Sequence, residues 1–175
     1  MLVRDVASLD LPSGGRVELG LGAGAFWEAI EAMGGRRLTP AQAVEALSEA
    51  IDIIRGIWDV DNTSRLRVDG TYYQVNGAKR GPAPAHDIGI WLGAYKPRML
   101  RLVGRKADGW LPSLSYIKSL TDLFDANAII DEAAREAGRE PAAVRRLLNI
   151  GGRFGPRATG SSPVRRSSGS SNWRS

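Results

Sequence analysis

Three glycines stand where the chain could hold a phosphate. In RVELGLGAGAFWEAI, residues 16–30, Gly20, Gly22 and Gly24 follow a strand-like alternation and precede a helix-like run. Glycine-rich turns of this kind bind phosphates through backbone N–H groups. The dinucleotide fingerprint G-x-G-x-x-G fits poorly, because the third glycine comes one residue early and the acid at the right distance, Glu45, falls within a predicted helix. The alternative is that the glycines only permit a tight turn with positive φ.

A second predicted strand end carries similar residues. In IWLGAYKPRML, residues 90–100, Gly93 and Ala94 follow an apolar run and precede Pro97, which suits the first position of a helix. Ligands of parallel β/α proteins bind at the carboxyl ends of the strands, where helix N-termini and free N–H groups favour anions. We therefore expect the two glycine-bearing ends to line one face.

Other chemically capable side chains have simpler structural interpretations. His86 lies in a predicted loop, where solvation or a structural hydrogen bond is a simpler role than that of a catalytic base. Asp108 is expected to end a helix and begin a turn. Glu28 could face a ligand beside the glycine loop, although a solvated helix face is the default. Three tryptophans near predicted strand ends could wall an aromatic pocket or pack in the core: Trp27, Trp91 and Trp110.

The composition excludes several kinds of site. The 175 residues include no cysteine and one histidine, which rules out disulfides, a cysteine nucleophile and multi-histidine zinc sites. With 43% hydrophobic residues, a chain of this length can bury a core. We find no apolar run of about 18 residues and no signal-peptide pattern, so we expect a cytoplasmic protein without a membrane span.

The positive charge is concentrated at the C-terminal end. The formal net charge is +5, yet residues 1–156 hold 20 basic and 19 acidic residues, and the other four basic residues lie in 157–175. We therefore expect the folded part to bind no nucleic acid.

The elements that must position these residues alternate between strand and helix. The apolar spacing predicts a helix over residues 39–58, with Thr39 as N-cap and Gln42 completing a capping box. RLRVDGTYYQV, residues 65–75, predicts a hairpin with a type I′ turn at Asp69-Gly70. No helix is expected before LDLPSGG, residues 9–15. The other expected elements are a strand at 88–92, a helix opened by Pro97, a strand at 108–114, a helix at about 121–137, a helix opened by Pro141 and a last strand at 147–152.

This alternation predicts an α/β protein built from parallel units with right-handed crossovers. About four β/α units are present, whereas a closed barrel has eight. The chain is therefore expected to be a piece of a larger β/α structure.

Several segments together resemble a known family. The blocks SGGRVELGLGAG and IWLGAYKPRML…ADGW, with VDGTYYQV between them and EAAREAGREPAAV after them, resemble the luciferase-like flavin-dependent monooxygenases, which include deazaflavin-dependent reductases. The resemblance runs in order over about residues 9–155. It implies a (β/α)₈ barrel with FMN or the deazaflavin coenzyme F-420 across its C-terminal face.

The resemblance also implies roles for particular residues. Backbone N–H groups of Gly93 and Ala94 would bind the cofactor phosphate, Ser113 would contribute a hydroxyl, and Gly22 and Gly24 would leave room for the cofactor. Glu28 remains a candidate beside them. Tyr95-Lys96 departs from the small residues common in the family, which bears on how closely a phosphate can approach.

The implied activity is that of an oxidoreductase acting on a small organic substrate by hydride transfer or oxygen insertion, with no protein nucleophile. Compared with the family, elements before residue 9 and after residue 155 are absent, so we expect a truncated form that self-associates or forms homodimers through open sheet edges. The alternatives are a non-catalytic remnant or binding module with a basic tail, and an unrelated phosphate-binding enzyme with a Rossmann-type sheet.

The last segment, residues 157–175, differs from the rest in composition. RATGSSPVRRSSGSSNWRS is rich in serine and arginine, which predicts a disordered tail after a barrel domain of residues 1–156. A nucleic-acid-binding tail is one alternative. A shifted reading frame is another, because regrouped codons can encode a glycine loop, a proline and an amphipathic helix. The nucleotide sequence tests this hypothesis.

Overall fold

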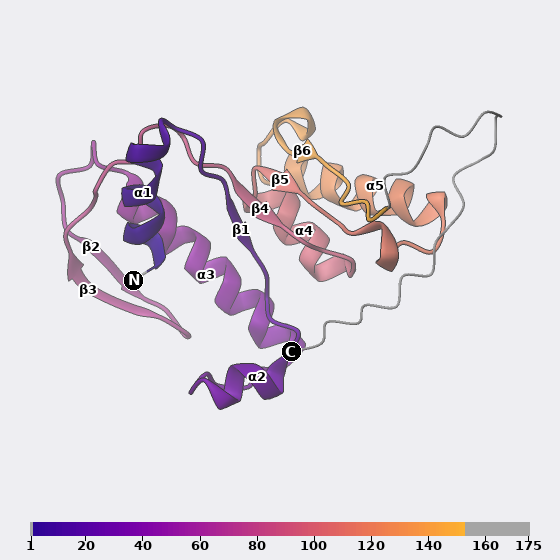
Figure 1. Ribbon diagram of the computed structural model, residues 1–175, viewed down its shortest axis with the longest axis horizontal. Helices are drawn as coiled ribbons and strands as arrows, with labels where there is room; N and C mark the ends of the chain where they lie inside the picture. Colours follow the sequence, from indigo (N-terminus) through magenta and orange to yellow (C-terminus); the bar gives the residue numbers. More distant parts are fainter. Residues whose placement is uncertain (1, 153–175) are drawn as a thin grey trace.

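A four-stranded parallel sheet organises the chain (Figure 1). The computed structural model describes residues 2–152, so the predicted boundary at residue 156 and the tail over 157–175 lie outside the described residues. The strand order is β1 (Leu19–Leu21), β4 (Ile90–Leu92), β5 (Gly109–Trp110) and β6 (Arg145–Arg146). All neighbouring pairs are parallel, so the four carboxyl ends meet at one edge. The predicted β/α architecture is confirmed.

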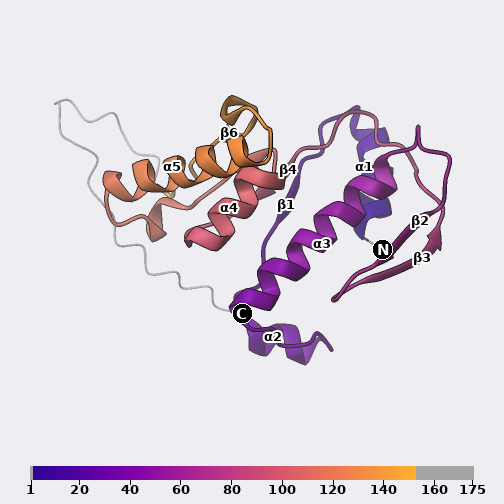
Figure 2. The ribbon, with the colours of Figure 1, turned by 180° about the vertical axis from the view of Figure 1, so that it is seen from behind.

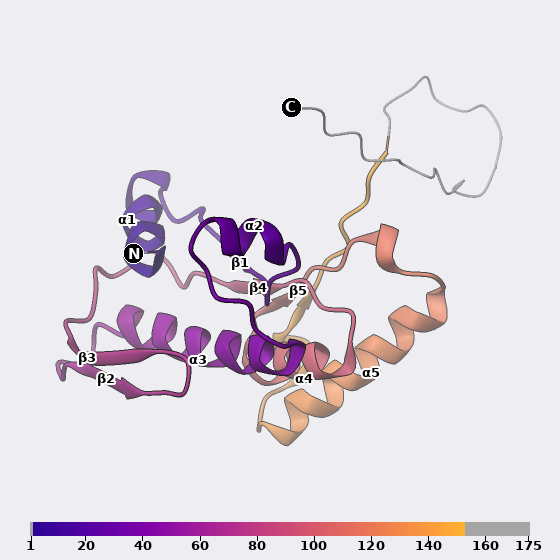
Figure 3. The ribbon, with the colours of Figure 1, turned by 90° about the horizontal axis from the view of Figure 1, so that it is seen from below.

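Three long helices cover one face of this sheet. Figure 3 shows α3 (Pro40–Trp58), α4 (Pro97–Lys106) and α5 (Leu120–Glu136) lying along the same side of the strands. The core lies between these layers, and its fully buried side chains include Ile51, Ile90, Leu92, Val103 and Ile130. The other sheet face has no such helix layer among residues 2–152.

The capping box predicted for α3 is present. The Thr39 hydroxyl accepts a hydrogen bond from the Gln42 amide, and the Gln42 side chain accepts one from the Thr39 amide at 3.0 Å. Two of the helix's orphan donors are thereby satisfied. Ser119 and Asp122 form an equivalent box at the start of α5. The predicted helices at 39–58, from Pro97 and at about 121–137 are confirmed.

The expectation of no helix before residue 9 is wrong. Helix α1 (Leu2–Ser13) packs against α3, and the Trp58 indole donates to the Val3 carbonyl at 2.9 Å. Only Val3, Ala7 and Asp10 of this helix are buried. One of these three buried residues, Asp10, is a carboxylate. The helix therefore has only two buried apolar residues, too few to form the periodic apolar pattern that predicts a helix.

The hairpin prediction is confirmed, but its turn type is wrong. Strands β2 (Leu66–Asp69) and β3 (Gln74–Ala78) pair antiparallel and enclose a loop over residues 70–73. Gly70 lacks the positive φ that a type I′ turn requires. The Glu49 carboxylate of α3 instead accepts hydrogen bonds from the three following loop amides, at 2.9, 2.9 and 3.1 Å. In Figure 2, α3 lies between this hairpin and β1.

The predicted helix after Pro141 and the position of the last strand are also wrong. Pro141 opens only a three-residue 3₁₀ turn, η2 (Pro141–Ala143), and β6 follows at once. Arg145 faces the open side of the sheet, where it pairs with Glu18. Arg146 faces α5, where it meets Asp131 at 2.5 Å. The strand thus begins two residues before the predicted segment. Its two residues are arginines that have partners on both faces of the sheet, so the strand has no apolar pattern by which to predict it. Only Asn149 of that segment makes a bridge, to Ser113.

Candidate functional site

The carboxyl edge of the sheet brings two of the predicted glycines together. The last pair between β1 and β4 is Leu21 with Leu92, so Gly22 and Gly93 come next on adjacent strands. A Cβ built at Gly22 meets no atom within 4 Å, and one built at Gly93 meets only the Leu111 carbonyl, at 3.7 Å. Both backbones are therefore open to close approach by a ligand.

Unused hydrogen-bond donors lie at the same edge. Within residues 2–152, the amides of Ala94 and Tyr95 donate to no other residue, whereas the parallel pairing of Leu21 with Leu92 directs the Gly93 amide toward β1. These residues lead into α4, whose N-cap is Lys96. Free N–H groups, a helix N-terminus and a lysine together favour an anion.

Ser113, which follows β5, joins this group. Its amide donates to the Tyr95 hydroxyl at 2.8 Å, and its hydroxyl accepts from the Asn149 side chain at 3.2 Å. The Trp110 indole donates to the Ala94 carbonyl at 3.0 Å and links the two strand ends. The structure thus brings Gly93, Ala94 and Ser113 to one place, while their role toward a cofactor stays a prediction.

Gly24 and Glu28 are arranged differently. Gly24 has φ of +94°, as expected for a glycine turn, and a Cβ there would lie 3.1 Å from the Trp27 ring. Glu28 lies on α2 (Trp27–Ala32), where its side chain is 90% exposed and 3.8 Å from Arg37. Its solvated position matches the default interpretation, and no contact links it to Gly93 or Ser113.

The open face of the sheet carries an alternation of large and absent side chains. The strand register aligns Gly20, Trp91, Gly109 and Arg145 in one row. The Trp91 ring lies over Gly109, where a Cβ would come within 2.0 Å of it, and the Arg145 guanidinium lies 4.5 Å from the ring centre. The glycine is required for this close approach.

Glu18 completes the arrangement on this face. It accepts hydrogen bonds from the Trp91 indole at 2.8 Å and from Arg145 at 2.9 Å. Burial acts to raise the pKa of Glu18, but these two donors outweigh it and hold that pKa below its usual value. Glu18 is therefore ionised, and its charge is balanced by Arg145.

The three tryptophans do not form one pocket. Trp91 and Trp110 are 7% and 2% exposed and pack on opposite faces of the sheet. Trp27 borders a hollow of about 450 Å³, which lies between α2 and the start of α3. Its other lining residues are Arg37, Leu38, Thr39, Pro40 and Gln42. Core packing thus accounts for Trp110, whereas Trp91 is buried on the open sheet face between Gly109 and Arg145.

His86 has a structural partner. Its Nδ1 atom lies 2.8 Å from the carboxylate of Asp10, a residue with no exposed surface. Burial would raise the pKa of Asp10, but the His86 side chain and the amides of Val17, His86 and Ala85 lower it to about 2. The structural interpretation of His86 is therefore correct.

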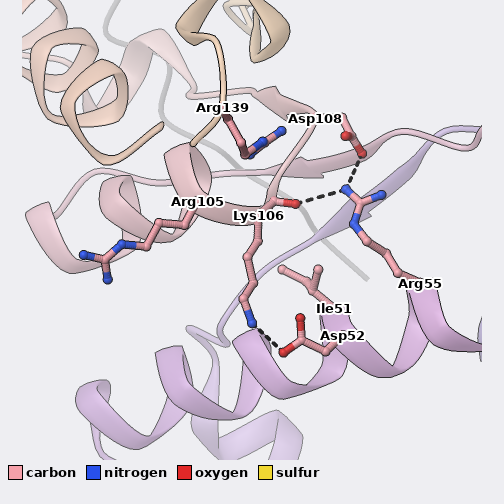
Figure 4. A pocket seen from close by; sticks show the side chains of 7 residues that line it. All are labelled: Ile51, Asp52, Arg55, Arg105, Lys106, Asp108 and Arg139. Carbon is pink, nitrogen blue, oxygen red and sulfur yellow. Dashed lines mark hydrogen bonds and ion pairs between the residues drawn. The ribbon is translucent and has the colours of Figure 1, made fainter. Parts of the chain in front are cut away.

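A cavity of about 370 Å³ at the opposite edge of the sheet is rich in charge (Figure 4). Arg55 pairs with Asp108 at 2.8 Å, and Lys106 pairs with Asp52 at 2.5 Å. Arg139 donates to two carbonyls in the last turn of α4, both at 2.7 Å. The remaining lining residues are Ile51 and Arg105. These cations neutralise the C-terminal end of a helix dipole, which is a structural role.

Neither a metal cluster nor a membrane span is found in the described part of the chain. Residues 2–152 contain no group of three or more histidine, aspartate or glutamate side chains arranged to hold a metal ion. None of their helices is long and apolar enough to cross a bilayer.

Two residues of the candidate site were not recognised as contributors from the sequence. Tyr95 is noted there only as a departure from small residues, yet its hydroxyl reaches Ser113. Asn149 falls within a predicted strand, yet its side chain also binds Ser113. Their position in the sequence could have indicated this role, because each residue follows a strand at the edge of the sheet where the ligand is expected.

A parallel β/α sheet with open glycines at its carboxyl edge places the chain among the β/α proteins, a class in which ligands bind at the strand ends. The family model for luciferase-like monooxygenases matches residues 1–151. The chain belongs to the luciferase-like monooxygenase family.

Individual relatives agree with this assignment. The phthiodiolone/phenolphthiodiolone dimycocerosates ketoreductase of Mycobacterium tuberculosis is 34% identical over 153 residues, covering 81% of this chain and 37% of the relative. The 5,10-methylenetetrahydromethanopterin reductase of Methanolobus tindarius is 35% identical over 139 residues, covering 79% of this chain and 39% of the relative. The chain thus spans well under half the length of these two relatives.

Solved structures confirm the fold. An F420-dependent secondary alcohol dehydrogenase in complex with an F420-acetone adduct superposes with a TM-score of 0.74 at 20% identity, covering 84% of this chain and 43% of that one. The described residues therefore form part of a luciferase-like TIM barrel, as the sequence predicts.

Proposed function

We propose that this chain contributes part of the cofactor-binding face of a flavin- or deazaflavin-dependent oxidoreductase. The cofactor is FMN or coenzyme F-420, and the substrate is a small organic molecule. The two relatives described above are named as reductases, which favours hydride transfer over oxygen insertion.

The observation that carries this proposal is the donor set at the carboxyl edge. Two amides without protein partners, at Ala94 and Tyr95, follow Gly93 and lie near Ser113 at the start of α4. Amides, a hydroxyl and a helix N-terminus suit a phosphate group. Gly22 and Gly93 leave the space above the strand ends free of Cβ atoms. These residues therefore fit a phosphate-bearing cofactor.

The chain's own residues would bind and orient the cofactor. When bound, the flavin or deazaflavin ring supplies the redox chemistry. Gly93, Ala94 and Ser113 would hold its phosphate, and Gly22 and Gly24 would let the cofactor approach the backbone. Glu28, whose side chain is 90% exposed on α2, is the further candidate for contact with the cofactor.

The remaining part of such a site would come from further barrel elements. The described sheet has four strands, and β1 and β6 have no outer neighbour within residues 2–152. We propose that the chain self-associates through these edges and the open sheet face, as a homodimer or a larger assembly.

Titration of the full 175-residue chain with oxidised and reduced FMN and with coenzyme F-420 tests the proposal. Wild-type protein should bind one of them, and Gly93→Val should weaken binding by about tenfold or more by blocking the phosphate's approach. Because the space at Gly93 is open, this variant should fold normally. Lys106→Gln, in the charged cavity at the opposite edge, is the control and should bind like wild type.

Two outcomes would contradict the proposal. One is a folded chain that binds neither cofactor in either redox state. The other is binding that is unchanged in Gly93→Val. Retention on nucleic acid that weakens steeply with salt would instead favour the binding-module alternative.

A further inference from the structure

One contact at the candidate site occupies a donor that a phosphate would need. The Tyr95 hydroxyl accepts the hydrogen bond of the Ser113 amide at 2.8 Å. Tyr95 comes from the loop between β4 and α4, and Ser113 from the loop that follows β5. The phenol therefore spans the two strand ends between which the cofactor phosphate is proposed to bind.

The ring of Tyr95 packs against a second tyrosine. Its centre lies 5.1 Å from that of Tyr116, with the ring planes tilted by 47°. Tyr116 belongs to η1 (Leu114–Tyr116) and is 68% exposed, while Tyr95 is 39% exposed. A half-exposed aromatic side chain with one exposed neighbour can change rotamer without disturbing the core.

The other side of Ser113 is fixed. The Leu114 amide donates to the Asn149 carbonyl at 2.9 Å, and the Asn149 amide donates to the Pro112 carbonyl at 2.9 Å. These bonds hold the loop after β5 against the segment after β6. The Ser113 amide therefore keeps its direction when Tyr95 moves, and only the acceptor changes.

We propose that Tyr95 is a specificity-determining residue that covers the phosphate subsite until a phosphate displaces it. This inference rests on the proposed function. The phenol oxygen takes the place that a phosphate oxygen would occupy on the Ser113 amide. An anionic oxygen makes a stronger hydrogen bond to an amide than a neutral phenol does. A ligand with a phosphate can therefore open the subsite, whereas an uncharged analogue cannot.

The displacement lowers the affinity for every ligand that must break the Tyr95 contact. A neutral hydrogen bond of this kind corresponds to about a three- to tenfold change in affinity. Tyr95→Phe removes the hydroxyl and keeps the ring. Tyr116→Phe is the matched control, because it alters the same ring pair and leaves the Ser113 contact intact.

The full-length wild-type chain and both variants are titrated with FMN and with riboflavin, which lacks the phosphate. Tyr95→Phe should bind FMN about three- to tenfold more tightly than wild type, with unchanged riboflavin affinity. Tyr116→Phe should match wild type for both ligands. Equal or weaker FMN binding by Tyr95→Phe overturns the inference, as does an equal gain for riboflavin.

A second measurement separates this inference from the proposed function. In an NMR titration with inorganic phosphate, the Ser113 amide signal should move at lower phosphate concentration in Tyr95→Phe than in wild type. If neither variant nor wild type binds FMN or coenzyme F-420, the proposed function fails, while the phosphate titration still decides the role of Tyr95. A Ser113 signal that responds identically in both proteins overturns the inference.

Discussion

Asp10 shows how a single polar residue can organise a segment that apolar patterning does not reveal. Its carboxylate accepts hydrogen bonds from the amides of Val17 and Ala85, at 3.2 and 2.8 Å, and contacts His86. These partners lie beyond α1, so one buried side chain ties the first helix to the strands that follow. A buried carboxylate is tolerated because all of its neighbours are donors.

The pH dependence of stability should report this residue. The pKa of Asp10 in the folded chain is about 2, below its ordinary value of 3.8. A lowered folded-state pKa means that the stabilisation is complete above the unfolded pKa and is lost as pH falls toward the folded one. We therefore expect the thermal midpoint of wild type to fall between about pH 4 and pH 2.

The variant Asp10→Asn provides the comparison. It should be less stable at neutral pH, because it loses the charge-assisted bonds, and its midpoint should change much less between pH 4 and pH 2. Circular dichroism melts at several pH values measure both proteins. Parallel curves for the two would mean that other carboxylates govern the acid transition.

At the residue scale the sequence could predict part of the candidate site. Gly22 and Gly93 were predicted because glycines after apolar runs mark strand ends, whereas Ser113 was predicted only through the family resemblance. Tyr95 could not be assigned its contact, because its partner is a backbone amide 18 positions away, and an amide carries no sequence signal.

The hairpin is the element whose structure depends most on another element. Its loop amides, from Thr71 to Tyr73, all donate to the Glu49 carboxylate on α3. Burial acts to raise the pKa of Glu49, but these three amides and the positive charge of Lys106 lower it. The helix thus supplies the acceptor that the turn itself lacks.

The variant Glu49→Gln should release this loop. The amides of residues 71–73 should exchange with solvent about three- to tenfold faster, while α3 keeps its helical signal. Asp52→Asn is the control, since it removes a charge from the same helix without a hairpin contact. Hydrogen exchange measured by mass spectrometry covers both segments. Unchanged exchange in Glu49→Gln would show that the hairpin holds its own loop.

Elements with self-contained signals were predictable from the sequence. Thr39, Pro40 and an apolar stripe predict helix α3. A short apolar run predicts strand β4. The type of the hairpin turn was not predictable, because Asp69-Gly70 suits a two-residue turn and the distant Glu49 stabilises a longer one. Strand β6 was misplaced because its two residues are charged and depend on partners from other elements.

For the whole molecule, the open sheet face is the feature with the clearest physical consequence. Leu111 and Leu147, two residues beyond the Trp91 row toward the carboxyl edge, are 38% and 54% exposed. In a closed barrel such residues face the interior. The number of β/α units and the parallel class were predictable, because both follow from the alternation of patterns along the chain.

We expect the chain to associate at micromolar concentrations, and Leu147→Asp to raise the dissociation constant by about tenfold or more, because it would bury an unpaired charge. Leu120→Asp is the control, as Leu120 is 72% exposed on the helix layer. Sedimentation velocity over a concentration series measures both. A monomeric wild-type chain with a sharp cooperative melt would contradict the self-association proposal.

The two arginines of β6 carry one last implication, for how this strand finds its alignment. Because Arg145 and Arg146 are identical and face opposite ways, sliding the strand by one residue in either direction would still deliver an arginine to one of the two sites. Pairing energy from these side chains therefore discriminates weakly between registers. The flanking residues must therefore fix the register. Val144 is 2% exposed, and Asn149 forms hydrogen bonds to the loop after β5 through both its backbone amide and its carbonyl. The correct alignment of this strand is encoded outside the strand itself.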